Sequence, residues 1–507
     1  MFAEALKLFF TPEVWLSLVI GVLGGMLVGA LPGLSASMAV ALLIPVTFQM
    51  SPAAGLVLLV SVYTSAIYGG SVTACLIHTP GTPSSAATAL DGFPMTKKGQ
   101  GLKAIGISTV SSMIGGSISA IALLLIAPQL SKLSLLMSSL EYFLLALFGL
   151  TVIGSLAGDS MVKGLMSGVF GLLVGCVGLD VMNGSPRFTF GVIALESGIQ
   201  LVPAMIGLFS ISQVMIAVED LVKGKHIILD DPDSLLKGRA LPTGQEIRQI
   251  LPTVGISSIL GILIGIMPGA GADIGSWVAY NFAKKRSKHP EQFGHGAIEG
   301  IAASESANNA VTGGAIIPLL TLGIPGSGVT AIMLGGMMIK GLVPGHELFT
   351  TQGNITYCII LGFLVANILM GLFGLLIAKQ VVKISTVPMT ILCPIIVALS
   401  TIGAYAVNSS MVDVYVMLAF GVIGYFARKF GFATAPIVLG LILGPMAEKN
   451  WRQALMFSRG DMLHYFLGRP VSIVLAVLVI IGLFSPIIMA FVNKKATGQD
   501  NLKAAED

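Results

Sequence analysis

Long apolar stretches, separated by short polar segments, run along nearly the whole chain. Stretches of about 17 to 25 apolar residues have the length that a helix needs to cross a bilayer, and their number predicts an all-α integral membrane protein, polytopic, with about 11 to 12 spans. The predicted membrane elements lie at 14–48, 53–95, 103–127, 138–157, 160–180, 190–218, 250–282, 298–340, 354–378, 387–405, 413–427, 433–447 and 470–492.

A polar stretch in the middle of the sequence divides these elements into two halves. The sequence predicts a first repeat at 1–218, a cytoplasmic linker at 219–249 and a second repeat at 250–447. The remaining residues, 448–507, are expected to form an interfacial segment, one extra span and a cytoplasmic tail.

Four of the elements are interrupted by a Pro-Gly pair at matching places in the two halves. The string LVGALPG at 27–33 returns as LIGIMPG at 263–269. In the next element of each half, GGS at 69–71 leads to PGTP at 80–83, and GGA at 313–315 leads to PGSG at 325–328. Matching apolar segments that Gly and Pro interrupt are the best sequence indication of a transporter's binding site.

Basic residues predict opposite orientations for the two halves, because cytoplasmic loops carry the excess of Lys and Arg. The loop after the second element contains Lys97, Lys98 and Lys103 in the first half and no Lys or Arg at 341–348 in the second. After the first element the pattern reverses, since 49–52 carry no basic residue and 284–288 carry four. The charges predict an inverted-topology repeat with the N-terminus outside and the C-terminus inside. A tandem duplication in one orientation is the alternative.

The first element of each half would then begin and end on the same side of the membrane. Residues 14–48 offer two arms of about 16 residues around Pro32 and Gly33, each about 24 Å long. Because the hydrocarbon core is about 30 Å thick, a re-entrant hairpin is favoured over two complete spans.

Composition agrees with a membrane protein and excludes several other classes. The chain is 55% hydrophobic and 10% charged, whereas soluble domains contain about 25% charged residues. A net charge of +4 is too small to suggest nucleic acid as a partner. The four cysteines show no CxxC spacing, so we expect neither disulfides nor a cysteine metal site. The N-terminus has no basic region ahead of its first apolar run, so no removable signal peptide is expected.

Motifs of enzyme chemistry are missing from the sequence. It contains no GxxxxGK[ST], HExxH or GxSxG pattern. We therefore expect a protein that is not an enzyme, holds no cofactor and is driven by an ion gradient or by a partner.

The residues around the breaks are small, and many carry hydroxyl groups. Broken helices expose backbone groups that lipid cannot satisfy, so such breaks persist where they line a polar cavity. Helix N-termini and neutral donors suit an anion such as a carboxylate. The substrate-binding candidates are Gly33, Leu34, Ser35, Ser71, Thr73, Pro80, Gly81, Thr82, Pro83, Ser84, Gly269, Gly271, Pro325, Gly326, Ser327 and Gly328.

A second set of residues could hold Na⁺, since helix C-terminal ends and side-chain oxygens suit this cation. The ion-binding candidates are Asp273, Asn308, Asn309 and Thr312. Glu299 and Glu305 are interpreted either as solvent-exposed residues at a helix start or as functional intramembrane acids. Asp91 is interpreted as a turn or helix-end residue. His78 is interpreted as a hydrogen-bonded residue near the break, with a titrating role as the alternative.

Several longer motifs resemble those of the large membrane subunit of tripartite tricarboxylate transporters, the TctA family. They are YGGS at 68–71, TPGTP at 79–83, TALDGFPM at 88–95, PGAGAD at 268–273, Asn308-Asn309 and GIPGSG at 323–328. The resemblance covers nearly the whole chain. One departure is His78, where many members are expected to have Asn.

The resemblance implies a permease of the bacterial inner membrane. For this multi-pass chain the charge pattern predicts a periplasmic N-terminus and a cytoplasmic C-terminus. The resemblance also implies a small membrane subunit and a periplasmic substrate-binding protein as partners, and Na⁺-coupled uptake of citrate or related carboxylates. Analogy with TRAP transporters adds an elevator movement. The alternatives are an ion channel with re-entrant pore loops and a proton-coupled transporter of another small organic solute.

Overall fold

The computed structural model describes residues 2–31, 34–78, 80–151, 160–180, 183–224, 239–267, 271–377, 380 and 389–481. The chain forms two compact units, each built from two separate stretches of sequence. Unit 1 combines Met1–Ser134 with Gln200–Phe426, and unit 2 combines Leu135–Ile199 with Ala427–Asp507.

Among the described residues, eight helices are long and apolar enough to cross a membrane. This confirms the prediction of an all-α polytopic membrane protein. The eight candidate spans are Pro12–Ala30, Pro52–Ile77, Gly101–Ser131, Leu201–Val222, Gly244–Ile266, Gly353–Leu376, Met389–Asn408 and Met411–Lys429.

Unit 1 contains most of the helices. In chain order they are α1 (Phe2–Phe9), α2 (Pro12–Ala30), α3 (Ala36–Thr47), α4 (Pro52–Ile77), η1 (Pro83–Ser85), α5 (Ala86–Lys97), α6 (Gly101–Ser131), α9 (Leu201–Ile206), the π-helical turn η5 (Gly207–Ile211), α10 (Ser212–Val222), α12 (Gly244–Ile266), α13 (Gly271–Arg286), η6 (Pro290–Gln292), α14 (Ile298–Leu322), α15 (Gly328–Ile339), α16 (His346–Thr350), α17 (Gly353–Leu376) and α19 (Met389–Asn408). Two helices cross a unit boundary in the sequence, η2 (Lys132–Leu136) and α20 (Met411–Lys429).

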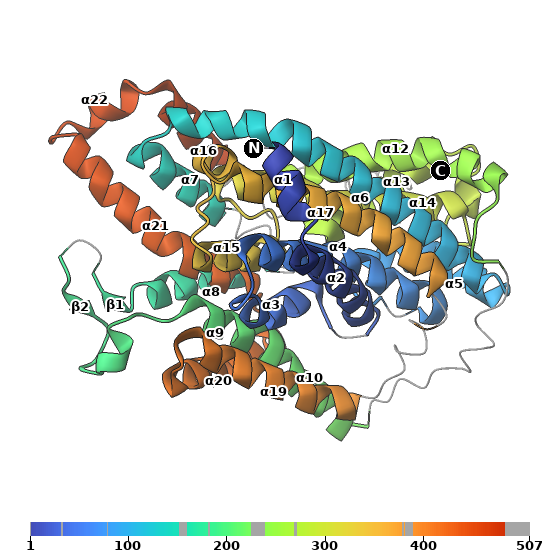
Figure 1. Cartoon of the computed structure of the whole chain (residues 1–507), viewed down its shortest axis with the longest axis horizontal. Helices are drawn as coiled ribbons and strands as arrows, with labels where there is room; N and C mark the ends of the chain where they lie inside the picture. Colours follow the sequence, from blue (N-terminus) through green and yellow to red (C-terminus); the bar gives the residue numbers. More distant parts are fainter. Residues whose placement is uncertain are drawn as a thin grey trace, which may run out of the picture. The chain divides into compact units, whose positions relative to one another are not determined.

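Helices α4 and α14 form the centre of unit 1, and nearly all of their residues are buried. Helices α2 and α17 pack on α4, while α6 and α12 pack on α14. Figure 1 shows α6, α12 and α14 side by side. Because the central helices are enclosed by protein, they tolerate the polar residues that a lipid-facing helix could not carry.

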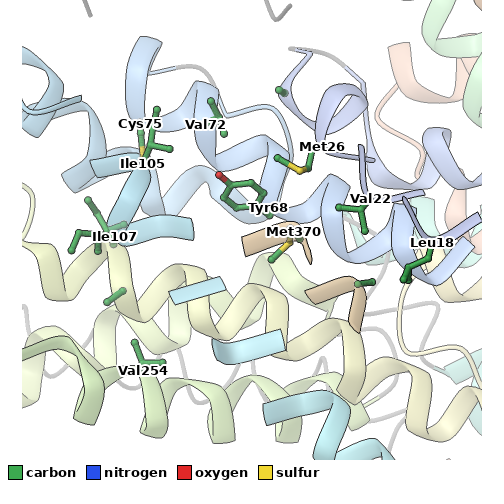
Figure 2. Close-up of a cluster of buried hydrophobic side chains, with 14 of the residues drawn as sticks. Leu18, Val22, Met26, Tyr68, Val72, Cys75, Ile105, Ile107, Val254 and Met370 are labelled. Carbon is green, nitrogen blue, oxygen red and sulfur yellow. The ribbon is translucent and has the colours of Figure 1, made fainter. Parts of the chain in front are cut away.

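A large apolar cluster joins helices from both halves of the sequence inside unit 1. Figure 2 shows Tyr68 of α4 with Met26 of α2 and Met370 of α17 close to its ring. Val254 of α12 belongs to the same cluster. The Tyr68 hydroxyl lies 2.7 Å from Thr109 Oγ1 of α6, so its polar end is satisfied within the core.

The four predicted breaks are interruptions between consecutive helices. They separate α2 from α3, α4 from η1 and α5, α12 from α13, and α14 from α15. Pro32, Gly33, Pro268 and Gly269 lie outside the described residues. The arms of the first element are unequal, with 19 residues in α2 and 12 in α3. The expected equal arms were wrong, and α2 is long enough to be a candidate span.

Unit 2 contains α7 (Ser139–Thr151), α8 (Met161–Gly175), η4 (Ile193–Leu195), α21 (Ala435–Phe457) and α22 (Met462–Leu467). Helix α21 packs on α7 and α8. It runs to Phe457, beyond the predicted end at 447. An apolar helix at Pro470–Ile481 falls within the predicted last span, whose remaining residues lie outside the described part of the chain.

The predicted span at 190–218 was wrong at its start. Within it only the short 3-10 helix η4 (Ile193–Leu195) precedes α9, which begins at Leu201. A short antiparallel hairpin of β1 (Gly178–Leu179) and β2 (Pro186–Arg187) lies just before the predicted span. Asp180 after β1 accepts hydrogen bonds from Arg452 of α21 at 2.9 and 3.0 Å. This ion pair holds the hairpin on α21.

Candidate functional site

In each half, the glycine of the second break packs against the C-terminal end of the first helix. These are Gly81 against α2 and Gly326 against α12. The Gly81 N–H donates to Gly70 O at 3.1 Å, and a Cβ at Gly81 would lie 2.2 Å from Gly29 O of α2. In the second half, a Cβ at Gly326 would lie 2.7 Å from Gly265 O of α12. Both contacts exclude a side chain, so the same close approach occurs twice in unit 1.

The arms that follow the breaks pair crosswise between the halves. Helix α3 packs on α15, and α13 packs on η1 and α5. The arm after each break therefore contacts an arm from the other half. The described helices that flank the four breaks are therefore linked by packing contacts within unit 1.

Serine residues cap the two arms that face each other. Ser35 Oγ accepts the Met38 N–H at 3.1 Å at the start of α3. Ser327 caps α15, where its Oγ accepts the Thr330 N–H at 3.3 Å and Thr330 Oγ1 accepts the Ser327 N–H at 2.8 Å. Leu34, ahead of Ser35, is buried. The first N–H groups of a helix have no acceptor within the helix, and such helix starts are suited to binding an anion.

The break before η1 presents a compact group of hydroxyls. Thr82 Oγ1 lies 3.0 Å from Ser84 Oγ, and Ser85 Oγ donates to Thr82 O at 2.7 Å. Thr82 and Ser84 are buried, whereas Pro83 is exposed. The hydroxyls predicted for this break are thus brought together by a local turn.

The other substrate candidates occupy varied positions. Ser71 and Thr73 lie inside α4, where Thr73 Oγ1 donates to Gly70 O at 3.2 Å. Gly271 begins α13 with a φ of +63°. Pro80, Pro325 and Gly328 lie in the breaks or at the start of the next helix, and Gly33 and Gly269 lie outside the described residues.

Two contacts that sequence reasoning missed join the halves. The Tyr63 hydroxyl of α4 lies 3.3 Å from Ser327 Oγ. Asn309 Nδ2 donates to Thr64 Oγ1 at 3.1 Å, and Thr64 Oγ1 donates to Asn367 Oδ1 at 2.7 Å. Thr64 lies five residues before Gly69 and Asn309 four residues before Gly313, so the repeat register in the sequence does not signal this contact.

The predicted ion ligands do not all share one environment. Asn308, Asn309 and Thr312 are fully buried in α14, and Thr312 Oγ1 donates to Asn309 O at 2.6 Å. The Oδ1 atoms of Asn308 and Asn309 are buried without a hydrogen-bond partner among the described residues. Asp273 is exposed in the first turn of α13.

Four ionisable residues near the breaks differ in exposure. Glu305 is fully buried in α14, so the interpretation as a solvent-exposed helix-start residue was wrong for it. Glu299 is partly exposed and accepts a hydrogen bond from Ser287 Oγ at 2.9 Å. Asp91 is fully buried within α5 rather than in a turn or at a helix end. His78 is exposed with a φ of +55° at the end of α4, and its ring centroid lies 4.9 Å from that of Phe93.

Comparison with known proteins identifies the family. The model of the Tripartite tricarboxylate transporter TctA family matches residues 15–439. The chain belongs to this family. The matched range includes every break and every candidate residue of both halves.

The chain is also similar to two proteins from Agrobacterium vitis. An uncharacterized 52.8 kDa protein in the TAR-I ttuC' 3' region is 37% identical over 488 residues, which cover 96% of this chain and 95% of the relative. An uncharacterized protein in the TAR-II ttuC' 3' region is 41% identical over 201 residues, covering 40% of this chain and 83% of that protein. No solved structure matches the chain.

Membership of the TctA family makes this multi-pass membrane protein a subunit of a tripartite tricarboxylate transporter. The resemblance inferred from the motifs is confirmed.

Proposed function

We propose that this chain is the permease of a binding-protein-dependent secondary importer of citrate or related carboxylates, coupled to Na⁺. A periplasmic binding protein delivers the substrate, and a small membrane subunit completes the complex in the bacterial inner membrane. The family supports this assignment. The observation that carries it is the single region in which four broken helices contact one another.

The chemistry of that region suits a carboxylate. Serine-capped helix starts at Ser35 and Ser327, with the hydroxyls of Thr82 and Ser84, supply neutral donors and the partial positive charge of helix N-termini. Neutral donors bind an anion without the lasting attachment that an Arg clamp would give, and a transporter must also release its substrate. The buried amide oxygens of Asn308 and Asn309 are suitable ligands for Na⁺.

The matching contacts of the two halves support an inverted repeat. Gly81 on Gly29 corresponds to Gly326 on Gly265, and the pairing of α3 with α15 corresponds to that of α13 with η1 and α5. Two repeats related by an inverted two-fold axis allow the same binding site to open to either side of the membrane. In the proposed transport cycle, the arms after the breaks move with the substrate as in an elevator.

Uptake of radiolabelled citrate into proteoliposomes tests the proposed function. The vesicles contain this chain and the small subunit, with the binding protein supplied outside. We expect accumulation only when both the binding protein and an inward Na⁺ gradient are present. Equilibration without accumulation would contradict a secondary importer and favour a channel, while accumulation driven by a proton gradient alone would contradict Na⁺ coupling.

A further inference from the structure

Glu305 is a fully buried acid in the middle of unit 1, and it forms no ion pair with any described residue. Two other buried acids of the described chain, Glu141 and Asp180, have cationic partners, whereas Asp91 is held by backbone N–H groups and a tyrosine hydroxyl. Glu141 accepts from Arg469 Nε at 2.5 Å, and Asp180 pairs with Arg452. Because removing an unpaired charge from water costs several kcal/mol, a buried acid without a counter-charge points to a functional site.

The Glu305 carboxylate is surrounded by neutral side chains from several helices. Thr88 Oγ1 of α5 donates to Oε1 at 2.5 Å, Ser112 Oγ of α6 donates to Oε2 at 2.8 Å, and Asn308 Nδ2 donates to Oε1 at 3.2 Å. Ser71 and Ser108 lie near the same carboxylate, and their hydroxyl oxygens are 2.7 Å apart. These partners solvate the carboxylate but contribute no positive charge.

The side chain of Asn308 provides an independent observation. Its Nδ2 contacts Glu305, while its Oδ1 is buried with no hydrogen-bond partner among the described residues. Leaving such an acceptor unpaired destabilises the fold, and buried polar atoms are rarely without a partner. The Asn308 Oδ1 atom, on a side chain that already contacts the buried carboxylate, is therefore available to bind a cation.

We propose that Glu305, Thr88, Ser112 and Asn308 form a binding site for one small monovalent cation, with Na⁺ as the physiological ion. Carboxylate, hydroxyl and amide oxygens are the ligands that a hard cation prefers. The single carboxylate carries one negative charge and therefore matches a monovalent ion, whereas divalent sites commonly use more carboxylates.

The position of this site gives a physical reason for coupling, which rests on the proposed function. Thr88 lies on α5, the arm that follows the second break, and Glu305 and Asn308 lie on α14, which leads to the fourth break. A cation held by both helices fixes the arms of the two halves relative to each other. Binding of the ion would then order the break region that receives the substrate.

The thermal stability of the purified full-length chain tests the site without any substrate. The melting temperature is measured in detergent at constant ionic strength while NaCl replaces choline chloride, since a ligand that binds only the folded state raises this temperature. The wild-type chain should be stabilised saturably by Na⁺ and less by K⁺. Glu305→Gln should abolish the response, and the matched control Glu299→Gln on the same helix should keep it.

A milder pair covers the case in which Glu305→Gln does not fold. Thr88→Val removes the hydroxyl at nearly constant shape and should raise the half-saturating Na⁺ concentration at least tenfold. Thr88→Ser keeps the hydroxyl and should change it less than threefold. Absence of saturable stabilisation in the wild type, or equal Na⁺ titrations of wild type and Thr88→Val, would overturn the proposal.

Uptake measurements separate this proposal from the proposed function. A chain that binds Na⁺ saturably through Glu305 but never accumulates citrate would overturn the function and leave the site standing. Na⁺-driven accumulation of citrate that survives Glu305→Gln would overturn the site and leave the function standing.

Discussion

Two buried carboxylates in unit 1, Asp91 and Glu305, are both fully inaccessible but have different partners. Asp91 Oδ1 accepts three backbone N–H groups, from Gly294, Gly296 and Ala297, each at 2.8 Å. The Tyr280 hydroxyl donates to Asp91 Oδ2 at 2.9 Å. Glu305 is instead held by the side chains of Thr88, Ser112 and Asn308.

The two sites differ in whether their hydrogen-bond donors can also act as oxygen ligands. The N–H groups that bind Asp91 have fixed directions at the start of α14, where the helix dipole also favours a negative charge. Asp91 is therefore satisfied permanently and joins α5 to the loop before α14. Hydroxyl and amide groups can rotate and offer oxygen atoms instead of protons. The surroundings of Glu305 can thus accept a cation, whereas those of Asp91 cannot.

Loss of the Asp91 carboxylate should have the largest effect on stability. Asp91→Ala leaves three N–H groups without their acceptor, one buried and two partly buried, and the buried one alone costs about 1–3 kcal/mol. We expect the greatest fall in melting temperature of any variant in this series and a low yield of monodisperse protein. Melting of detergent-purified chains checks this, and an Asp91→Ala chain as stable as Glu305→Gln would remove the distinction between the two sites.

Gly300→Ala should damage the same structural contact from the other side. A Cβ at Gly300 would lie 2.1 Å from Asp91 Oδ2 and 2.9 Å from Tyr280 Cε2, so the carboxylate must shift away from its donors. The melting temperature should fall by less than in Asp91→Ala. Gly255→Ala is the matched control, because a Cβ there meets no atom within 4 Å. Equal melting temperatures of Gly300→Ala and Gly255→Ala would contradict close packing of the Asp91 carboxylate against Gly300.

The smallest effect is expected from Tyr280→Phe, which removes one hydroxyl from Asp91 and leaves the three N–H donors. Stability should fall by about 1 kcal/mol, and the half-saturating Na⁺ concentration should not change. Thr88→Val removes one hydroxyl from Glu305 and should shift that concentration strongly. Na⁺ titrations of both variants make a direct comparison. An equal shift of the half-saturating Na⁺ concentration in the two would contradict a cation site at Glu305 that Asp91 lacks.

The breaks could be predicted from sequence because Pro and Gly interrupt a helix through local chemistry. Pro80-Gly81 and Pro325-Gly326 lie between helices in the structure as expected. The environment of Glu305 could not be predicted, because it depends on α5 and α6 enclosing a residue of α14 that is more than 190 positions away from Ser112 and Thr88. No local pattern records such packing.

The same limit applies to the larger divisions of the chain. The predicted repeats at 1–218 and 250–447 follow the sequence in order and stay a prediction. The compact units instead join distant stretches, since Leu135–Ile199 associates with Ala427–Asp507. The hairpin that precedes the predicted span at 190–218 is likewise held by a long-range ion pair between Asp180 and Arg452, which hydropathy cannot anticipate.

The account depends most on the claim that the breaks form the transport site, and uptake kinetics of Ser327→Ala test it directly. Ser327 caps α15 and contacts Tyr63 of the other half. Initial rates of Na⁺-driven citrate uptake are compared with wild type, with Asn308→Ala, and with Gly24→Ala, where a Cβ meets no atom within 4 Å. We predict slower uptake in Ser327→Ala and Asn308→Ala at unchanged expression and partner assembly, and wild-type rates in Gly24→Ala. Wild-type kinetics in both Ser327→Ala and Asn308→Ala would contradict a transport site at the breaks.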